Sequence, residues 1–130
     1  QLRFSSLQYL TIKPIKSKKY ENGKIELDIE LDNYILLSPE VLPIDEKNRK
    51  KLEKVIEEDP ISLVDYWSID PEYDGETFRS KWQEYRENNE DLRIKRKAKI
   101  VVPKTKGKTK VCVKAVDVFG FESVVVQEVN

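Results

Sequence analysis

The residues best suited to a chemical task are the bases between residues 92 and 116. This span contains ten Lys or Arg and no Asp or Glu. Arg93, Lys95, Lys97 and Lys99 occupy every second position, which in a β-strand places four cations on one face over about 20 Å. Such a row can follow the phosphates of a nucleic acid, with binding that weakens as salt rises. The alternative is a solubilising edge strand, because lysines on a sheet edge oppose strand-to-strand aggregation.

The nucleic-acid hypothesis extends this row to the Lys-rich turn that follows it and to the outer side of a neighbouring hairpin. Tyr85 in that hairpin is a candidate for stacking on a base. The predicted nucleic-acid-binding residues are Arg79, Lys81, Tyr85, Arg93, Lys95, Lys97, Lys99, Lys104, Lys106 and Lys108.

Acidic residues are concentrated in a different part of the chain. Residues 57–78 contain eight Asp or Glu and no Lys or Arg. Five of them could offer oxygen ligands to Ca²⁺; they are Asp65, Asp70, Glu72, Asp74 and Glu76. Their spacing matches no calcium loop, and acids in turns usually bond their own backbone, so no metal site is predicted. The acidic and basic blocks could pair across neighbouring strands or face different partners.

Catalysis is not expected from this sequence. The chain has no His, and its single Cys112 lies within an apolar strand pattern without an imidazole to activate it. Asp65 could form a carboxylate pair with Asp70 or Asp117 only at a separation that the fold would have to set. Asp117 is interpreted as a structural carboxylate that bonds the turn amides near Gly120. No catalytic residue and no cofactor is predicted.

The N-terminal third predicts a β-hairpin over residues 7–31. Its first strand covers 7–15 and ends near Pro14, which lacks an N–H for a ladder, and residues 16–19 form a basic exit. Asn22-Gly23 supplies the positive-φ positions of the turn. The return strand alternates apolar and acidic residues with a period of two, which predicts one buried and one wet face. The apolar members are Ile25, Leu27, Ile29 and Leu31.

One helix is expected, over residues 46–57. Asp45 is a suitable N-cap, and Leu52, Val55 and Ile56 share one face. Asp59-Pro60 should end the helix abruptly.

The remaining residues predict five more strands. Strands 63–69 and 76–86 flank a turn at 70–75 that needs Gly75, with Trp67, Phe78 and Trp82 pointing inward. Strands at 92–102, 109–118 and 123–129 follow. About seven short strands with one helix indicate a mainly β protein, an immunoglobulin-like antiparallel β-sandwich.

The length of 130 residues predicts a single β-sandwich domain over residues 1–130. The chain does not begin with Met, so we expect it to be excised from a longer one. It has no apolar run of the length that spans a membrane, and its lone cysteine suits a reducing, cytoplasmic compartment. Abundant Lys and Glu without Met or His is compatible with a thermophile.

Two stretches resemble known families. Residues 108–129 resemble the closing hairpin of immunoglobulin-like domains of the polycystic-kidney-disease-repeat kind. Segments 64–70, 73–75, 78–83 and 116–120 together resemble the C-terminal part of adenine-specific DNA methyltransferases of the modification-subunit type. The likeness extends over residues 60–130, and more loosely over 7–45.

The methyltransferase resemblance implies an appended domain without the chemistry. No Asp-Pro-Pro-Tyr or Asn-Pro-Pro-Tyr tetrapeptide and no Gly-rich cofactor loop is present, and Asp70-Pro71-Glu72-Tyr73 lacks the second proline. The implied partners are the remainder of a methyltransferase chain, in a restriction-modification system, and duplex DNA. An alternative is an immunoglobulin-like protein-interaction module that uses the acidic hairpin and has no connection to nucleic acid. An independent hydrolase is disfavoured.

Overall fold

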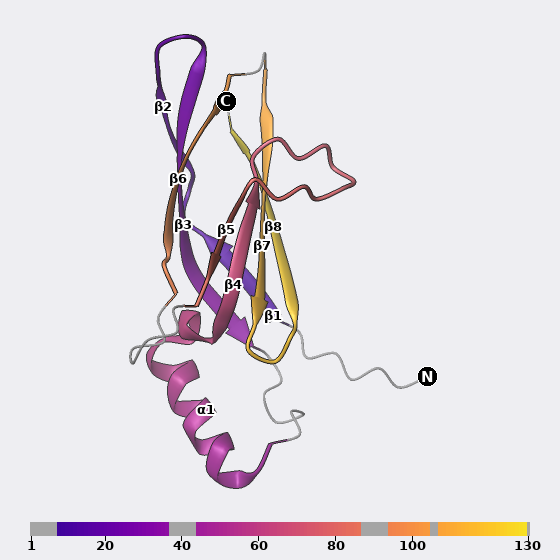
Figure 1. The fold of residues 1–130 in the computed structure, drawn as a ribbon. Coiled ribbons are helices and arrows are strands. Elements are labelled where there is room, and N and C mark those ends of the chain that lie inside the picture. Colours follow the sequence, from indigo (N-terminus) through magenta and orange to yellow (C-terminus); the bar gives the residue numbers. More distant parts are fainter. Residues whose placement is uncertain (1–7, 37–43, 87–93, 105–106, 130) are drawn as a thin grey trace.

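The computed structural model describes residues 8–36, 44–86, 94–104 and 107–129, whose arrangement is shown in Figure 1. Within these residues the protein is mainly β, with eight strands and one α-helix. The strands are β1 (Gln8–Ile12), β2 (Lys16–Lys19), β3 (Lys24–Leu36), β4 (Val64–Asp70), β5 (Trp82–Tyr85), β6 (Lys97–Pro103), β7 (Thr109–Asp117) and β8 (Glu122–Val129). The helix is α1 (Glu46–Glu58), and a short 3-10 helix, η2 (Pro60–Leu63), follows it.

The strands form two antiparallel sheets. In the first, the long strand β3 pairs with β1 along its C-terminal half and lies between β2 and β6 along its N-terminal half. The second sheet has the order β5-β4-β7-β8. The predicted mainly β sandwich with one helix is therefore confirmed. The strand count is eight rather than seven because the basic segment interpreted as an exit, Lys16–Lys19, is itself the strand β2.

The core lies between the sheets. The predicted alternation of β3 is confirmed, since Ile25, Leu27, Ile29 and Leu31 are all buried. From the second sheet, Trp67 is fully buried and packs edge-on against the half-buried Trp82, with ring centroids 4.5 Å apart. The prediction that both indoles contribute to the interior holds fully for Trp67 and in part for Trp82.

A buried hydrogen-bond cluster joins the sheets. The register of β3 shifts at Asp32, which is an extra residue in the pairing with β1. Tyr34 and Leu31 therefore both point inward, although residues three apart in a regular strand face opposite sides. Tyr34 donates its hydroxyl to Asp117 Oδ2 at 2.5 Å, and Asp117 Oδ1 accepts from the backbone N–H groups of Phe119 and Phe121. Burial and the Asp117 carboxylate raise the pKa of Tyr34. The structural role predicted for Asp117 is therefore confirmed.

The helix and its ends agree with the sequence. Asp45 caps α1 by accepting from the Asn48 N–H at 2.7 Å, and the helix ends before Asp59 and Pro60 as predicted. Leu52 is its buried residue. The helix η2 that follows was not predicted.

The strand predicted over 76–86 is wrong for most of its length, because β5 covers only Trp82–Tyr85. The preceding segment is a loop held by two carboxylates. Asp70 accepts from the N–H groups of Glu72 and Arg79, and Asp74 accepts from those of Glu76 and Thr77. Backbone donors used in this way are not available to a ladder.

Phe78 consequently lies outside the sandwich interior, contrary to the prediction. It is half-buried on the loop, with Lys114 Nζ 5.5 Å from its ring centroid.

Two further strand boundaries differ from the prediction. The strand expected over 7–15 ends at Ile12, because the extended segment around Pro14 interrupts the pairing before β2. The strand expected over 92–102 begins only at Lys97; its residues 92–93 lie outside the described residues.

Candidate nucleic-acid interface

Lysines and carboxylates meet on the outer face of the first sheet. Because the apolar side chains of β3 point inward, the side chains of Glu26, Asp28 and Glu30 between them point outward. The register brings lysines of β2 and β6 to both sides of these acids. We call this surface the lysine face; it consists of Lys13, Lys16, Lys18, Glu26, Asp28, Glu30, Lys97 and Lys99.

Two rows of lysine, carboxylate and lysine cross this face, and they differ. In the first, Glu30 is 2.7 Å from Lys13 Nζ and 3.9 Å from Lys97 Nζ, so the row is closed by ion pairs. In the second, Asp28 lies in register with Lys16 on one side and Lys99 on the other. No ion pair joins these three residues within the described part of the chain. The second row is therefore open.

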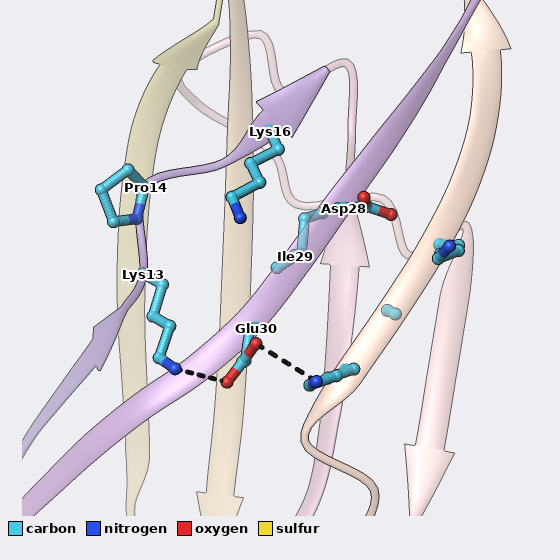
Figure 2. A pocket seen from close by; sticks show the side chains of 9 residues that line it. Lys13, Pro14, Lys16, Asp28, Ile29 and Glu30 are labelled. Carbon is cyan, nitrogen blue, oxygen red and sulfur yellow. Dashed lines mark ion pairs between the residues drawn. The ribbon is translucent and has the colours of Figure 1, made fainter. Parts of the chain in front are cut away.

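A hollow of about 350 Å³ lies over the two rows (Figure 2). In this view the side chain of Lys13 reaches Glu30 on β3, and that of Lys16 extends from β2 into the space between Pro14 and Ile29. The hollow is lined by Lys13, Pro14, Lys16, Asp28, Ile29, Glu30, Lys97, Ala98 and Lys99. Four lysines against two carboxylates leave it with a net charge of +2.

The closed row is held together by ion pairs, although its two lysines and one carboxylate keep a net charge of +1. The hydrogen bond from Lys13 lowers the pKa of Glu30, with smaller contributions from the charges of Lys13, Lys97 and Lys16. The same contact raises the pKa of Lys13. Asp28 has no such partner among the described residues, and its Oδ1 is buried without a hydrogen bond.

Part of the predicted binding set lies on or beside the lysine face. Lys97 and Lys99 point outward from the edge strand β6. Lys95 precedes this strand and Lys104 follows it; both are exposed. Lys108 lies at the start of the second sheet and is 3.7 Å from Glu128. Arg93 and Lys106 lie outside the described residues.

The other three predicted residues are not brought to this face. Arg79 and Lys81 lie on the loop before β5, and Arg79 is 2.8 Å from Asp74. Tyr85 is on β5, where it is 59% exposed and packs on Tyr66 with ring centroids 5.3 Å apart. These residues belong to the second sheet and its loop, whereas β6 belongs to the first.

Lys13, Lys16 and Lys18 were missed by the sequence reasoning. Their signal was the acidic side of β3, because three outward carboxylates on a central strand favour bases on the strands that flank it. The segment 16–19 was the nearest basic run, but four consecutive polar residues show no period of two and do not indicate a strand.

The carboxylate pairs considered from the sequence do not form a shared site. Asp65 lies at the irregularity of β4 next to Asp117 of β7, but its side chain is half-exposed beside Arg86, whereas Asp117 is buried against Tyr34. Asp65 and Asp70 are five residues apart on β4, about 17 Å along a strand, which is too far for a carboxylate pair that shares a substrate. No group of three or more potential metal ligands occurs in the described ranges. Burial raises the pKa of the Cys112 thiol. Among the described residues, one ion pair connects the acidic and basic blocks, that of Arg96 with Asp59 at 2.5 Å.

No known family model matches this chain. No curated protein and no solved structure matches it either. The methyltransferase resemblance therefore stays a prediction that depends on the segments quoted above. In the part of the chain that the structure describes, no helix has the length and apolar character needed to cross a membrane.

Proposed function

We propose that the chain is a non-catalytic accessory domain that contacts the phosphate backbone of duplex DNA through the lysine face. The observation that carries this proposal is the open row, in which Lys16 and Lys99 flank the hollow without a partner among the described residues. Lysines that are not neutralised within the protein can release counterions from DNA, which is the main source of backbone affinity.

The surrounding residues support an extended contact. Lys18 and Lys19 on β2 and Lys95 and Lys104 at the ends of β6 are exposed, and none has an ion pair in the described ranges. Neighbouring strands lie about 4.8 Å apart, so β2 and β6 place two lysine rows about 10 Å apart across β3. A surface of this kind binds phosphates without reading bases.

The wider assignment follows the resemblance. We propose that the parent protein is an adenine methyltransferase of a restriction-modification system that acts in the cytoplasm. In this proposal the domain supplies DNA-backbone contact or a docking surface, and the catalytic residues and cofactor site lie elsewhere in the parent chain.

The test is a titration of labelled duplex DNA by fluorescence anisotropy at two salt concentrations. We expect binding at low salt that weakens steeply at higher salt. The double variant Lys16→Gln, Lys99→Gln should have a shallower salt slope, by about one for each phosphate that the protein no longer neutralises. The matched control removes two exposed helix charges, Lys50→Gln and Lys51→Gln, and should leave the slope unchanged. Absence of binding at low salt would remove the proposal.

A second candidate is a protein-interaction module, which exposed apolar side chains on the second sheet favour. Val124 and Val126 on the edge strand β8 are 56% and 47% exposed, and Tyr85 lies on the opposite edge strand, β5. A domain that fails to bind DNA yet loses association with its parent chain in the double variant Val124→Thr, Val126→Thr would support this function instead.

A further inference from the structure

We propose that the hollow on the lysine face is a site for a phosphate group that carries a proton, either hydrogenphosphate or a protonated phosphate monoester. This inference deepens the proposed function, and rests on it for the assignment of the carrier, a phosphorylated nucleic-acid end. The ligand class follows from the difference between the two rows.

The closed row is the comparison for the open row. Lys13 and Lys97 share the Glu30 carboxylate, so both lysines of that row already have an ion-pair partner. The open row also consists of a carboxylate between two lysines, with Asp28 in place of Glu30, but among the described residues neither Lys16 nor Lys99 forms an ion pair. Two ammonium groups on either side of a hollow with net positive charge select an anion.

Asp28 restricts which anions can bind in the hollow. A carboxylate beside an anion site repels the ligand unless the ligand donates a hydrogen bond to it. Its Oδ1 is buried without a partner, and the side chain as a whole is only partly buried. Asp28 also lines the hollow, so its carboxylate can accept a hydrogen bond from a ligand there. A phosphate hydroxyl can donate to Asp28 while the other oxygens of the phosphate accept from Lys16 and Lys99.

The same geometry excludes close relatives of this ligand. Sulfate has the size and shape of phosphate but no proton at neutral pH, so it offers Asp28 no donor. A phosphodiester within a DNA strand likewise has no hydroxyl on phosphorus. The hollow should therefore distinguish a free or terminal phosphate from both, whereas the surrounding lysines contact internal phosphates without this distinction.

The experiment titrates the ¹⁵N-labelled protein with sodium phosphate and with sodium sulfate at equal ionic strength and pH 6. We expect shifts in β2, β3 and β6 and an affinity for phosphate about tenfold above that for sulfate, the effect of one charge-assisted hydrogen bond. In Asp28→Asn this preference for phosphate should be lost or reversed. Equal affinities in the wild type, no binding of either anion, or shifts confined to other strands would overturn the proposal.

Two further arms keep the outcome decisive. Lys16→Gln and Lys99→Gln should weaken the binding of both anions, that of sulfate at least as much as that of phosphate, because sulfate carries the larger charge at pH 6. These variants test the site if Asp28→Asn does not fold, and Lys51→Gln is the charge control. An oligonucleotide with a 5′-phosphate, compared with the same strand without it, tests the carrier. DNA binding without phosphate preference overturns this inference and leaves the proposed function standing. Phosphate preference without DNA binding would support the phosphate site and overturn the proposed function.

Discussion

At the scale of single residues, the described chain uses its carboxylates in two ways. Buried or turn carboxylates such as Asp117, Asp70 and Asp74 accept from backbone N–H groups and fix the local chain path. The outward carboxylates of β3 face lysines across strands. The first group stabilises the fold, and the second determines the charge of the surface proposed to bind phosphate.

Tyr34→Phe should destabilise the protein, because it leaves Asp117 Oδ2 without its buried donor. We expect a decrease of about 2 kcal/mol in the free energy of unfolding, measured by urea denaturation. Tyr20→Phe removes a hydroxyl that bonds Glu26 on the surface and should cost less than about 0.5 kcal/mol. Equal decreases in the two variants would contradict the role given to the Tyr34 and Asp117 pair.

The pKa of Glu30 should depend on Lys13. In the folded protein this pKa lies below its ordinary value of 4.5, so the contribution of ionised Glu30 to stability is complete above about pH 4.5 and is lost as pH falls through the lowered pKa. Lys13→Gln should raise the Glu30 pKa toward 4.5 and weaken this acid dependence. A carboxyl NMR titration measures the shift, with Lys51→Gln as the control variant that should not change it.

At the scale of elements, the sequence predicted those whose local signals agree. The alternation of β3, the Asn22-Gly23 turn and the cap of α1 each depend on residues close in sequence. The prediction of a strand was wrong over residues 76–81, where Thr77 and Phe78 are residue types that favour strands. Asp70 and Asp74 instead draw those amides into a loop, and nothing in the local pattern reveals which amides a carboxylate will reach.

The cap of α1 gives a test at this scale. Asp45→Ala removes the acceptor of the Asn48 N–H and should reduce the free energy of unfolding by about 1 kcal/mol. Asp45→Asn keeps a side-chain oxygen at the cap and should retain most of the stability. Urea denaturation followed by circular dichroism provides the measurement; a similar decrease in both variants would point to charge rather than capping.

At the scale of the whole molecule, side-chain hydrogen bonds connect the two sheets. Tyr34 of the first sheet bonds Asp117 of the second, and Trp67 Nε1 of β4 donates to the Lys95 carbonyl just before β6 at 2.7 Å. These contacts link positions 83 and 28 residues apart along the chain. Sequence patterns indicated that Trp67 is internal, but they did not reveal its partner. Part of the candidate site was missed for the same reason. The pairing of β2 with β3 could not be predicted, because β2 has no alternation of apolar and polar residues.

Trp67→Phe should therefore cost more than Trp82→Phe. The first removes a fully buried indole and its bond to Lys95, with an expected decrease of about 3 kcal/mol in the free energy of unfolding. The second shortens a half-buried side chain and should cost about 1 kcal/mol. Far-ultraviolet circular dichroism during urea unfolding compares them, and the reverse order would contradict the packing of the two sheets.

Because β3 alternates between the interior and the lysine face, its side chains can be exchanged but its number of residues cannot change. The residues from Ile25 to Leu31 supply the interior with one set of side chains and the lysine face with the set between them. Deletion of one residue there would send Asp28 and Glu30 inward and the isoleucines into water. Variation in the charge of the lysine face must then arise by exchanging side chains at fixed length.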